Sequence, residues 1–283
     1  MLLLGKPIAQ KIHQQTKLLV DKLKQKNITP SLGVVLVGDD KPSLTYVKKK
    51  GELAEKLGIK FDLFKFDADI SQQELLIEIR NIQNDNNLSG LIIQLPIPEH
   101  LYTPEILNAV KPEIDIDCLT HTNVGKLMLH NPTFIPPTPQ AVIEMLLSIN
   151  VDVKGKNVTI IGAGALVGKP LTAMLINAKA SVTTCNSSTK NTKQKCLDAD
   201  IIITGVGANK FLIDQTMVHK DSIVIDTGIW FDDDNKMHGD VDYKNIVDKV
   251  AYVTPTPRGV GPITVACLLR NVAISKDQLS KNN

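Results

Sequence analysis

The chain has 283 residues, of which 43% are hydrophobic and 4% aromatic, and its 32 Lys and Arg nearly balance 30 Asp and Glu, giving a formal net charge of +2. At roughly 150 residues per domain, this length predicts about two domains, each with its own hydrophobic core. Such balanced charge argues against a nucleic-acid partner, and no apolar run approaches the ~20 residues that a membrane span needs.

Cysteine and histidine spacing bears on metal binding and on the cellular compartment. The four cysteines are far apart and form no C-x-x-C pair, and none of the six histidines stands at metal-ligand spacing. The N-terminal run of three leucines is too short for the core of a signal peptide. We therefore expect no metal site and a reducing, cytoplasmic location.

The first third of the chain alternates between helical and strand periodicity. Apolar residues at helical spacing predict an amphipathic first helix, and the run LGVVLV that follows is too short for a helix and reads as a buried strand. Such alternation predicts βαβ units around a parallel sheet covered on both faces. The expected helices are residues 7–26, 43–57 and 71–84, and the expected strands are 32–37, 60–66 and 90–95.

The second half repeats this alternation after an irregular, proline-punctuated stretch. Residues 111–139 show little periodicity and are interpreted as a crossover between domains. The expected fold is therefore α/β, with two βαβ domains that each have a parallel sheet. Its later elements are helices at 140–149 and 263–274 and strands at 157–161, 181–184, 201–204 and 223–226.

The segment GAGALVG at residues 162–168 follows a predicted strand and opens a predicted helix. That context is typical of a dinucleotide-binding turn, in which glycines let the backbone approach a pyrophosphate at a helix N-terminus. The alternative is an ordinary βα turn without a nucleotide. No carboxylate ends the next strand at TTCNS, which favours NADP over NAD, although no Arg or Lys follows until Lys190.

Tyr46 and Lys50 lie four residues apart on a predicted helix, so they share one face. A lysine desolvated beside an aromatic ring in a cleft is suited to acid/base chemistry. The alternative is that Lys48–Lys50 is a solvated charge run, which is the usual role of such a run.

Polar residues near the ends of predicted strands are further candidates. Gln94 interrupts an apolar strand at its carboxyl end, where open α/β sheets place ligand groups, but it is equally well explained as a buried, hydrogen-bonded amide. Asp115 and Asp117 alternate, so an extended chain would point both the same way, towards a ligand or towards solvent. The proline- and glycine-rich segment 254–262 predicts a stiff loop before the last helix.

Together these motifs resemble the bifunctional methylenetetrahydrofolate dehydrogenase/cyclohydrolase family nearly from end to end. The anchors are Tyr46-Val47 with Lys50, GLIIQLPIP around Gln94, DID with Asp117 and the following Asn123-Val124-Gly125, PPTP at 136–139, VGKP at 167–170, VIDTGI at 224–229, GDVDY at 239–243 and TPTPRGVGPIT at 254–264.

The resemblance implies a homodimer whose subunits have two domains with a cleft between them. Residues 1–118 with 262–283 would form the folate-binding catalytic domain, and residues 119–261 the Rossmann-type NAD(P) domain. The implied reaction oxidises 5,10-methylenetetrahydrofolate to 5,10-methenyltetrahydrofolate with NADP, and water then opens the product to 10-formyltetrahydrofolate.

Roles for individual residues are implied by the same resemblance. Lys50 would be the catalytic acid/base and Gln94 its hydrogen-bond partner, while Tyr46 would stack on the folate ring and Asp117 would accept hydrogen bonds from the pterin. Further substrate contacts are implied at Leu95, Gly259 and Pro262. The implied cofactor-binding residues are Gly162, Ala163, Gly164, Val167, Gly168, Ser187, Thr204, Gly228 and Ile229.

Several positions depart from the family pattern, mostly in the cofactor half and in loops. Ala163 stands where an arginine is usual, and Asn186 where a histidine is usual. The arginine would meet the 2′-phosphate of NADP. Its absence leaves two alternatives to an NADP-dependent enzyme: a dehydrogenase that uses NAD, or a chain that is mainly a cyclohydrolase. A non-catalytic binding protein is a third, which the intact Tyr46, Lys50, Gln94 and Asp117 argue against. The remaining departures are Pro137, Ala141, Cys118 and Arg258.

Overall fold

The computed structural model describes residues 1–85 and 87–281. The chain divides into two compact units. The first unit comprises Lys11–Ile135 and the residues from Leu268 onward, and the second comprises Met1–Gln10 and Pro136–Cys267. Each unit contains a parallel sheet, which confirms the α/β class. Domain boundaries at residues 118 and 262 stay a prediction.

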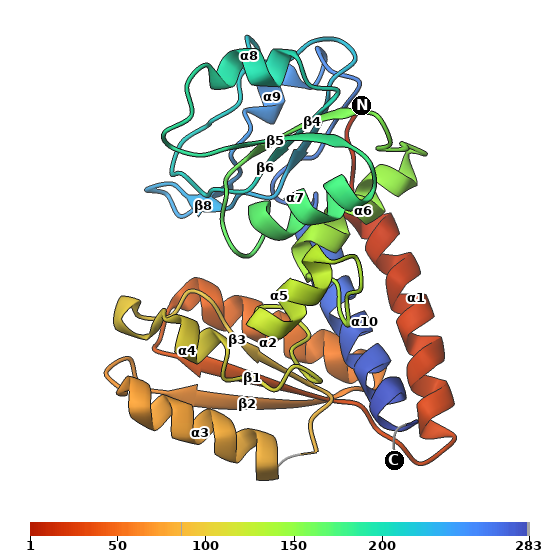
Figure 1. The fold of residues 1–283 in the computed structure, drawn as a ribbon, viewed down its shortest axis with the longest axis vertical. Helices are drawn as coiled ribbons and strands as arrows, with labels where there is room; N and C mark the ends of the chain where they lie inside the picture. Colours follow the sequence, from red (N-terminus) through yellow and green to blue (C-terminus); the bar gives the residue numbers. More distant parts are fainter. Residues whose placement is uncertain (86, 282–283) are drawn as a thin grey trace. The chain divides into compact units, whose positions relative to one another are not determined.

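The first unit is built on a parallel sheet of three strands in the order β2-β1-β3 (Figure 1). All seven residues of the central strand β1 are buried, which explains its unbroken apolar run. The helix that follows begins where the Asp40 side chain accepts a hydrogen bond from the Ser43 amide, and it ends at Gly58 in the left-handed conformation. The elements are β1 (Ser31–Val37), α2 (Lys41–Leu57), β2 (Lys60–Phe66), α3 (Gln72–Asp85) and β3 (Gly90–Ile93).

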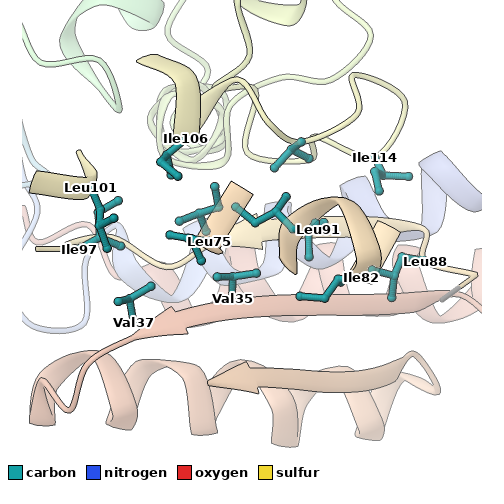
Figure 2. Close-up of a cluster of buried hydrophobic side chains, with 13 residues drawn as sticks. Val35, Val37, Leu75, Ile82, Leu88, Leu91, Ile97, Leu101, Ile106 and Ile114 are labelled. Carbon is teal, nitrogen blue, oxygen red and sulfur yellow. The ribbon is translucent and has the colours of Figure 1, made fainter. Parts of the chain in front are cut away.

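One hydrophobic layer holds the sheet of this unit to its helices. Figure 2 shows Val35 and Val37 of β1 meeting Leu91 of β3 and Leu75 of α3 in this layer. Leu75 is fully buried, with 0% of its surface exposed. Burying each such side chain stabilises the unit by about 1.5–3 kcal/mol, so this layer fixes the sheet from which Gln94 emerges.

The stretch interpreted as an irregular crossover contains regular structure, so that prediction was wrong in part. Helix α5 (His121–Met128) begins where the Thr120 hydroxyl accepts from the Asn123 amide. Helix α6 (Pro137–Ser148) starts within the PPTP segment, because proline at a first helical turn loses no backbone hydrogen bond. Short turns η1 (Glu99–Leu101) and α4 (Pro104–Leu107) precede them.

The second unit has a five-stranded parallel sheet in the order β10-β7-β6-β4-β5. Its strands β4 to β7 agree with the predicted positions to within one residue, whereas the antiparallel hairpin of β8 and β9 was not predicted. The strands are β4 (Asn157–Ile161), β5 (Ser181–Cys185), β6 (Ile201–Thr204), β7 (Ile223–Asp226), β8 (Trp230–Phe231), β9 (Met237–His238) and β10 (Tyr252–Val253), and the helices are α7 (Gly168–Asn177), α8 (Thr192–Leu197) and α9 (Tyr243–Ile246).

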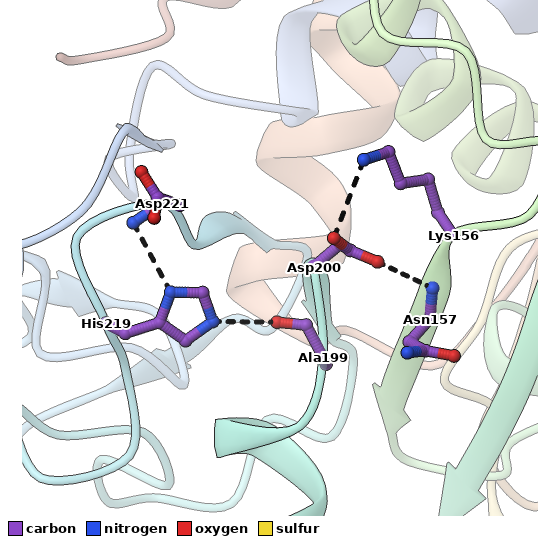
Figure 3. Close-up of polar contacts among 6 residues, drawn as sticks. All are labelled: Lys156, Asn157, Ala199, Asp200, His219 and Asp221. Carbon is purple, nitrogen blue, oxygen red and sulfur yellow. Dashed lines mark hydrogen bonds and ion pairs between the residues drawn. The ribbon is translucent and has the colours of Figure 1, made fainter.

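The amino ends of these strands are joined by polar contacts that serve the fold (Figure 3). Asp200, just before β6, accepts from the Asn157 amide of β4 at 2.8 Å and pairs with the Lys156 amine at 3.5 Å. The Asp221 amide donates to Nδ1 of His219, so Nε2 carries the proton donated to the Ala199 carbonyl. These residues lie at the amino ends of the strands. Ligands bind at the opposite edge in such folds, at the carboxyl ends of the strands.

Two long helices contribute residues to both units. They are α1 (Gly5–Lys24) and α10 (Gly261–Leu279), the latter longer than the predicted 263–274. Within the first unit, the buried Asn271 of α10 donates from Nδ2 to the carbonyls of Ile116 and Ile135, both at 2.9 Å. None of the helices in the described part of the chain is both long and apolar enough to cross a membrane.

Candidate active site

The centre of the first unit's site is a lysine–glutamine pair. Helix α2 places Tyr46 and Lys50 one turn apart, and Gln94 directly follows β3. Nζ of Lys50 donates to Oε1 of Gln94 at 2.8 Å, and Nε2 of Gln94 donates to the Leu95 carbonyl at 2.6 Å. The second bond orients the amide, so that its oxygen faces the amine. The structure therefore brings together residues that are 44 positions apart in the chain.

The electrostatics of this pair suit proton transfer. Burial lowers the pKa of Lys50, and the Asp117 carboxylate opposes that shift. Gln94 accepts a hydrogen bond without adding charge, so it holds the amine and leaves the lowered pKa in place. Burial likewise raises the pKa of the Tyr46 phenol, which stays neutral near pH 7.

Asp115 and Asp117 have different roles. The chain is not extended here, because turns occupy residues 112–114 and 116–117. Asp115 is buried and accepts from the Leu119 and Thr120 amides, the Thr120 hydroxyl and Nδ2 of Asn123, so it fixes the start of α5. Asp117 interacts electrostatically with Lys50. Burial raises the pKa of Asp117 to about 6, while Lys50 opposes the rise and Asp115 adds to it.

The lowered pKa of Lys50 gives a testable pH dependence for any reaction in which its neutral amine accepts a proton. The rate should rise with pH and then level off, and the midpoint of the rise should lie below 10.5, the ordinary pKa of lysine. Gln94→Glu places a carboxylate beside the amine, so the midpoint should move upward. The measurement is the pH profile of hydrolysis after subtraction of the uncatalysed rate, and an unmoved midpoint in Gln94→Glu would contradict the pairing.

The glycine turn of the second unit connects β4 to α7 and is closely packed. Gly162 has a φ of +112°, and a Cβ there would lie 2.7 Å from the Gly205 carbonyl oxygen. A Cβ on Gly168 would lie 1.9 Å from the Gly162 oxygen, whereas Gly164 has no atom within 4 Å of its Cβ position. The turn thus folds tightly and leaves open space above Gly164 at the start of α7. A tight glycine turn at a helix start is typical of pyrophosphate-binding loops.

The end of β5 has no acidic side chain. Asn186 closes a local turn there, since its Oδ1 accepts from the Ser188 amide at 3.0 Å and its own amide donates to the Thr189 hydroxyl at 2.9 Å. Ser187 is exposed between them. Hydroxyl and amide groups at this position accommodate a phosphate, which a carboxylate would repel.

The other predicted cofactor residues lie on neighbouring loops. Thr204, at the end of β6, is buried, and its hydroxyl donates to Oδ1 of Asp226 at 2.9 Å. Ile229 is 40% exposed, and Gly228 leaves room for the Asp240 carboxyl group, whose carbon would lie 2.2 Å from a Cβ at that position. The motifs VIDTGI and GDVDY contain Asp226 and Asp240, but sequence reasoning gave these acids no role. An acid that ends an apolar strand, as in IVID, was the available signal.

The loop after β10 carries Gly259, and Pro262 lies in the first turn of α10; both belong to the second unit. Its conformation is fixed by a hydrogen bond from the Gly5 amide to the Arg258 carbonyl at 2.9 Å. A Cβ on Gly259 would lie 2.5 Å from the Pro255 oxygen, so this position requires glycine.

Arg258 has a φ of +82°, a conformation that disfavours any residue with a Cβ. We expect Arg258→Gly to raise the free energy of unfolding by about 1 kcal/mol, because relief of the left-handed strain exceeds the entropy cost of glycine. Arg258→Ala keeps the Cβ and should give no such gain. Thermal unfolding followed by circular dichroism measures both, and equal stability of the two variants would contradict the strain.

A parallel sheet with a glycine turn at its carboxyl edge, in a chain that also carries a half-buried lysine paired with an amide, defines a class: two-domain α/β enzymes with a Rossmann-type dinucleotide unit. Residues 3–117 match the family described as tetrahydrofolate dehydrogenase/cyclohydrolase, catalytic domain, and residues 136–279 match its NAD(P)-binding domain. The chain belongs to the tetrahydrofolate dehydrogenase/cyclohydrolase family.

Individual relatives agree with this assignment along the whole chain. The bifunctional protein FolD of Nautilia profundicola is 44% identical over 98% of this chain and 97% of its own length. The crystal structure of the FolD methylenetetrahydrofolate dehydrogenase/cyclohydrolase from Campylobacter jejuni has a TM-score of 0.94 at 38% identity, covering 99% of both chains. The Trypanosoma brucei enzyme, solved with NADP and an inhibitor, has a TM-score of 0.94 at 30% identity, covering 99% of this chain and 98% of its own.

Proposed function

We infer that this chain oxidises 5,10-methylenetetrahydrofolate to 5,10-methenyltetrahydrofolate with NADP and hydrolyses the product to 10-formyltetrahydrofolate. The observation that carries this inference is the 2.8 Å hydrogen bond between Lys50 and Gln94 in a chain of this family. A lysine whose pKa is lowered by burial and whose partner is neutral loses its proton more readily than a free lysine, which suits it to acid/base chemistry.

Hydrolysis depends on the first unit. Water adds to the methenyl carbon, and the proton that it loses passes to the neutral Nζ of Lys50. The bond between this carbon and N5 then breaks as N5 takes up a proton and the hydroxyl loses one, which leaves a formyl group on N10. Gln94 keeps the amine in place through this sequence, and its uncharged amide does not stabilise the ammonium as a carboxylate would.

The folate itself is held by the neighbouring side chains. Tyr46 stacks on the flat pterin ring, one helical turn from Lys50, and Asp117 accepts hydrogen bonds from the pterin nitrogens. Leu95 is a further proposed substrate contact in the first unit, and Gly259 and Pro262 are proposed substrate contacts by resemblance to the family.

The glycine turn of the second unit holds the dinucleotide. A bound oxidised nicotinamide would supply the acceptor for the hydride of the methylene carbon. The backbone at Gly162, Ala163 and Gly164 and the start of α7 bind the pyrophosphate, while Ser187 at the end of β5 meets the 2′-phosphate. Val167, Gly168, Thr204, Gly228 and Ile229 complete the proposed cofactor site. Because Ala163 supplies no guanidinium, preference for NADP rests on the missing carboxylate after β5.

Initial rates with 5,10-methylenetetrahydrofolate test this cofactor assignment. We expect NADPH to form faster with NADP than NADH forms with NAD at equal concentrations. A faster reaction with NAD would reverse the assignment, and no reaction with either would remove the dehydrogenase activity. We further propose that the protein acts as a homodimer in the cytoplasm. Gel filtration with light scattering tests the dimer.

A further inference from the structure

Outside the residues assigned above, one buried acid is bonded to a loop beside the cofactor turn. Asp240 has 0% of its surface exposed, and its side chain lies against the segment that follows β6. Its Oδ2 accepts from the Val206 amide at 2.7 Å, and its Oδ1 accepts from the amides of Gly207 at 2.9 Å and Ala208 at 3.3 Å. We call residues 205–208 the β6 loop. Three backbone donors thus converge on one carboxylate, which holds this loop in one conformation.

The β6 loop packs directly against the glycine turn. The space where a Cβ on Gly162 would lie is bounded by the Gly205 oxygen at 2.7 Å and a Val206 methyl at 3.1 Å. Conversely, a Cβ on Gly205 would lie 3.2 Å from a methyl carbon of Val167. Strands β4 and β6 are neighbours in the sheet, so the two loops emerge side by side at its carboxyl edge. A shift of the β6 loop therefore displaces the turn or fills the open space above it.

A second buried acid fixes Asp240 in turn. Oδ1 of Asp226 accepts from the Asp240 amide at 3.1 Å, and Oδ2 accepts from the Val241 amide at 3.1 Å. Space for the two carboxylates depends on glycine: a Cβ on Gly239 would lie 1.8 Å from Oδ2 of Asp226, and one on Gly228 would lie 2.2 Å from Oδ2 of Asp240. The arrangement is thus built into the packing of three loops.

We propose that Asp240 is a positioning residue for the dinucleotide, acting through the β6 loop on the glycine turn. This inference rests on the proposed function. The amides of Val206, Gly207 and Ala208 already donate to Asp240, so they are not free to bind a phosphate. The β6 loop therefore shapes the wall beside the glycine turn, and the turn itself binds the pyrophosphate.

The test is Asp240→Asn in the full-length protein, measured by equilibrium binding of NADP and by hydrogen exchange of the Val206 and Gly207 amides without cofactor. The asparagine side chain has one oxygen acceptor and one NH2 donor, so at least one of the loop amides loses its acceptor. Exchange should therefore accelerate and the Kd for NADP should rise about tenfold or more. Hydrolysis of supplied 5,10-methenyltetrahydrofolate without dinucleotide should stay within about twofold, because Lys50 and Gln94 belong to the other unit. Asp233→Asn, an exposed site with the same charge change, is the control.

Unchanged NADP binding and unchanged exchange in Asp240→Asn would overturn the proposal, whereas a wild-type chain that does not bind NADP would overturn the proposed function instead. If Asp240→Asn also loses hydrolysis, Gly207→Ala decides. Gly207 has a φ of +69°, and its Cβ would meet the Ile229 oxygen at 2.7 Å, so this variant disturbs the β6 loop and leaves Asp240 in place. Weakened NADP binding with hydrolysis retained supports the proposal, and wild-type binding contradicts it.

Discussion

Lys50→Met is expected to abolish hydrolysis of 5,10-methenyltetrahydrofolate while folate still binds. Methionine keeps an unbranched apolar side chain but has no amine, so the hydrogen bond to Gln94 and the proton acceptor are both lost. General acid/base groups contribute about 10²–10⁴-fold to rate, so we expect kcat to fall by at least that factor, to the uncatalysed rate. The measurement is the disappearance of supplied substrate, with folate binding followed separately.

Lys49→Met is the matched control for this prediction. Lys49 is exposed on the same helix, so the change in charge and shape is the same. We expect its hydrolysis rate to stay near that of the wild type. Near-normal turnover in Lys50→Met, or equal losses in the two variants, would contradict the role given to Lys50.

The second large effect is expected from Gly164→Val in the glycine turn. No atom lies within 4 Å of a Cβ at this position, so the free protein should accept the side chain without loss of stability. The valine instead fills the space that a pyrophosphate needs, and a misplacement of about 1 Å costs roughly 10²-fold in rate. Dehydrogenase activity and NADP binding should fall by about that factor, while hydrolysis of supplied 5,10-methenyltetrahydrofolate should persist.

Gly125→Val provides the comparison for this variant. Gly125 lies on α5 in the first unit and also has no atom within 4 Å of its Cβ position. It should retain NADP binding. If Gly164→Val binds NADP as tightly as Gly125→Val does, the open space above the turn is not the cofactor site.

Local patterns in the sequence predicted most of the sheets and the candidate residues. In an apolar run such as LGVVLV the side chains on both faces of the strand must be buried. A central strand of a covered parallel sheet meets this need, and β1 lies at the centre of its sheet. Tyr46 and Lys50 share a helix, so their proximity followed from helical spacing alone. Gln94 was equally consistent with a structural amide, and only the fold, which brings β3 to α2, shows that its partner is Lys50.

Features that depend on contacts distant in the sequence could not be predicted in this way. Asp115 and Asp117 look equivalent in IDID, but in the turns at residues 112–114 and 116–117 the first accepts four hydrogen bonds and the second interacts electrostatically with Lys50. Asp240 bonds a loop more than 30 residues away along the chain. No local periodicity encodes such a contact. Helix α5 was missed because its eight residues are too few for a clear amphipathic pattern.

The most direct test of the central claim, that one chain carries both reactions, is a time course with 5,10-methylenetetrahydrofolate and NADP in which NADPH and 10-formyltetrahydrofolate are measured together. The wild-type chain should form both products in equal final amounts, and Lys50→Met should not convert supplied 5,10-methenyltetrahydrofolate faster than the uncatalysed reaction. If the wild-type chain forms NADPH but converts supplied 5,10-methenyltetrahydrofolate no faster than buffer does, or if it forms no NADPH, the claim that this chain catalyses both steps is wrong.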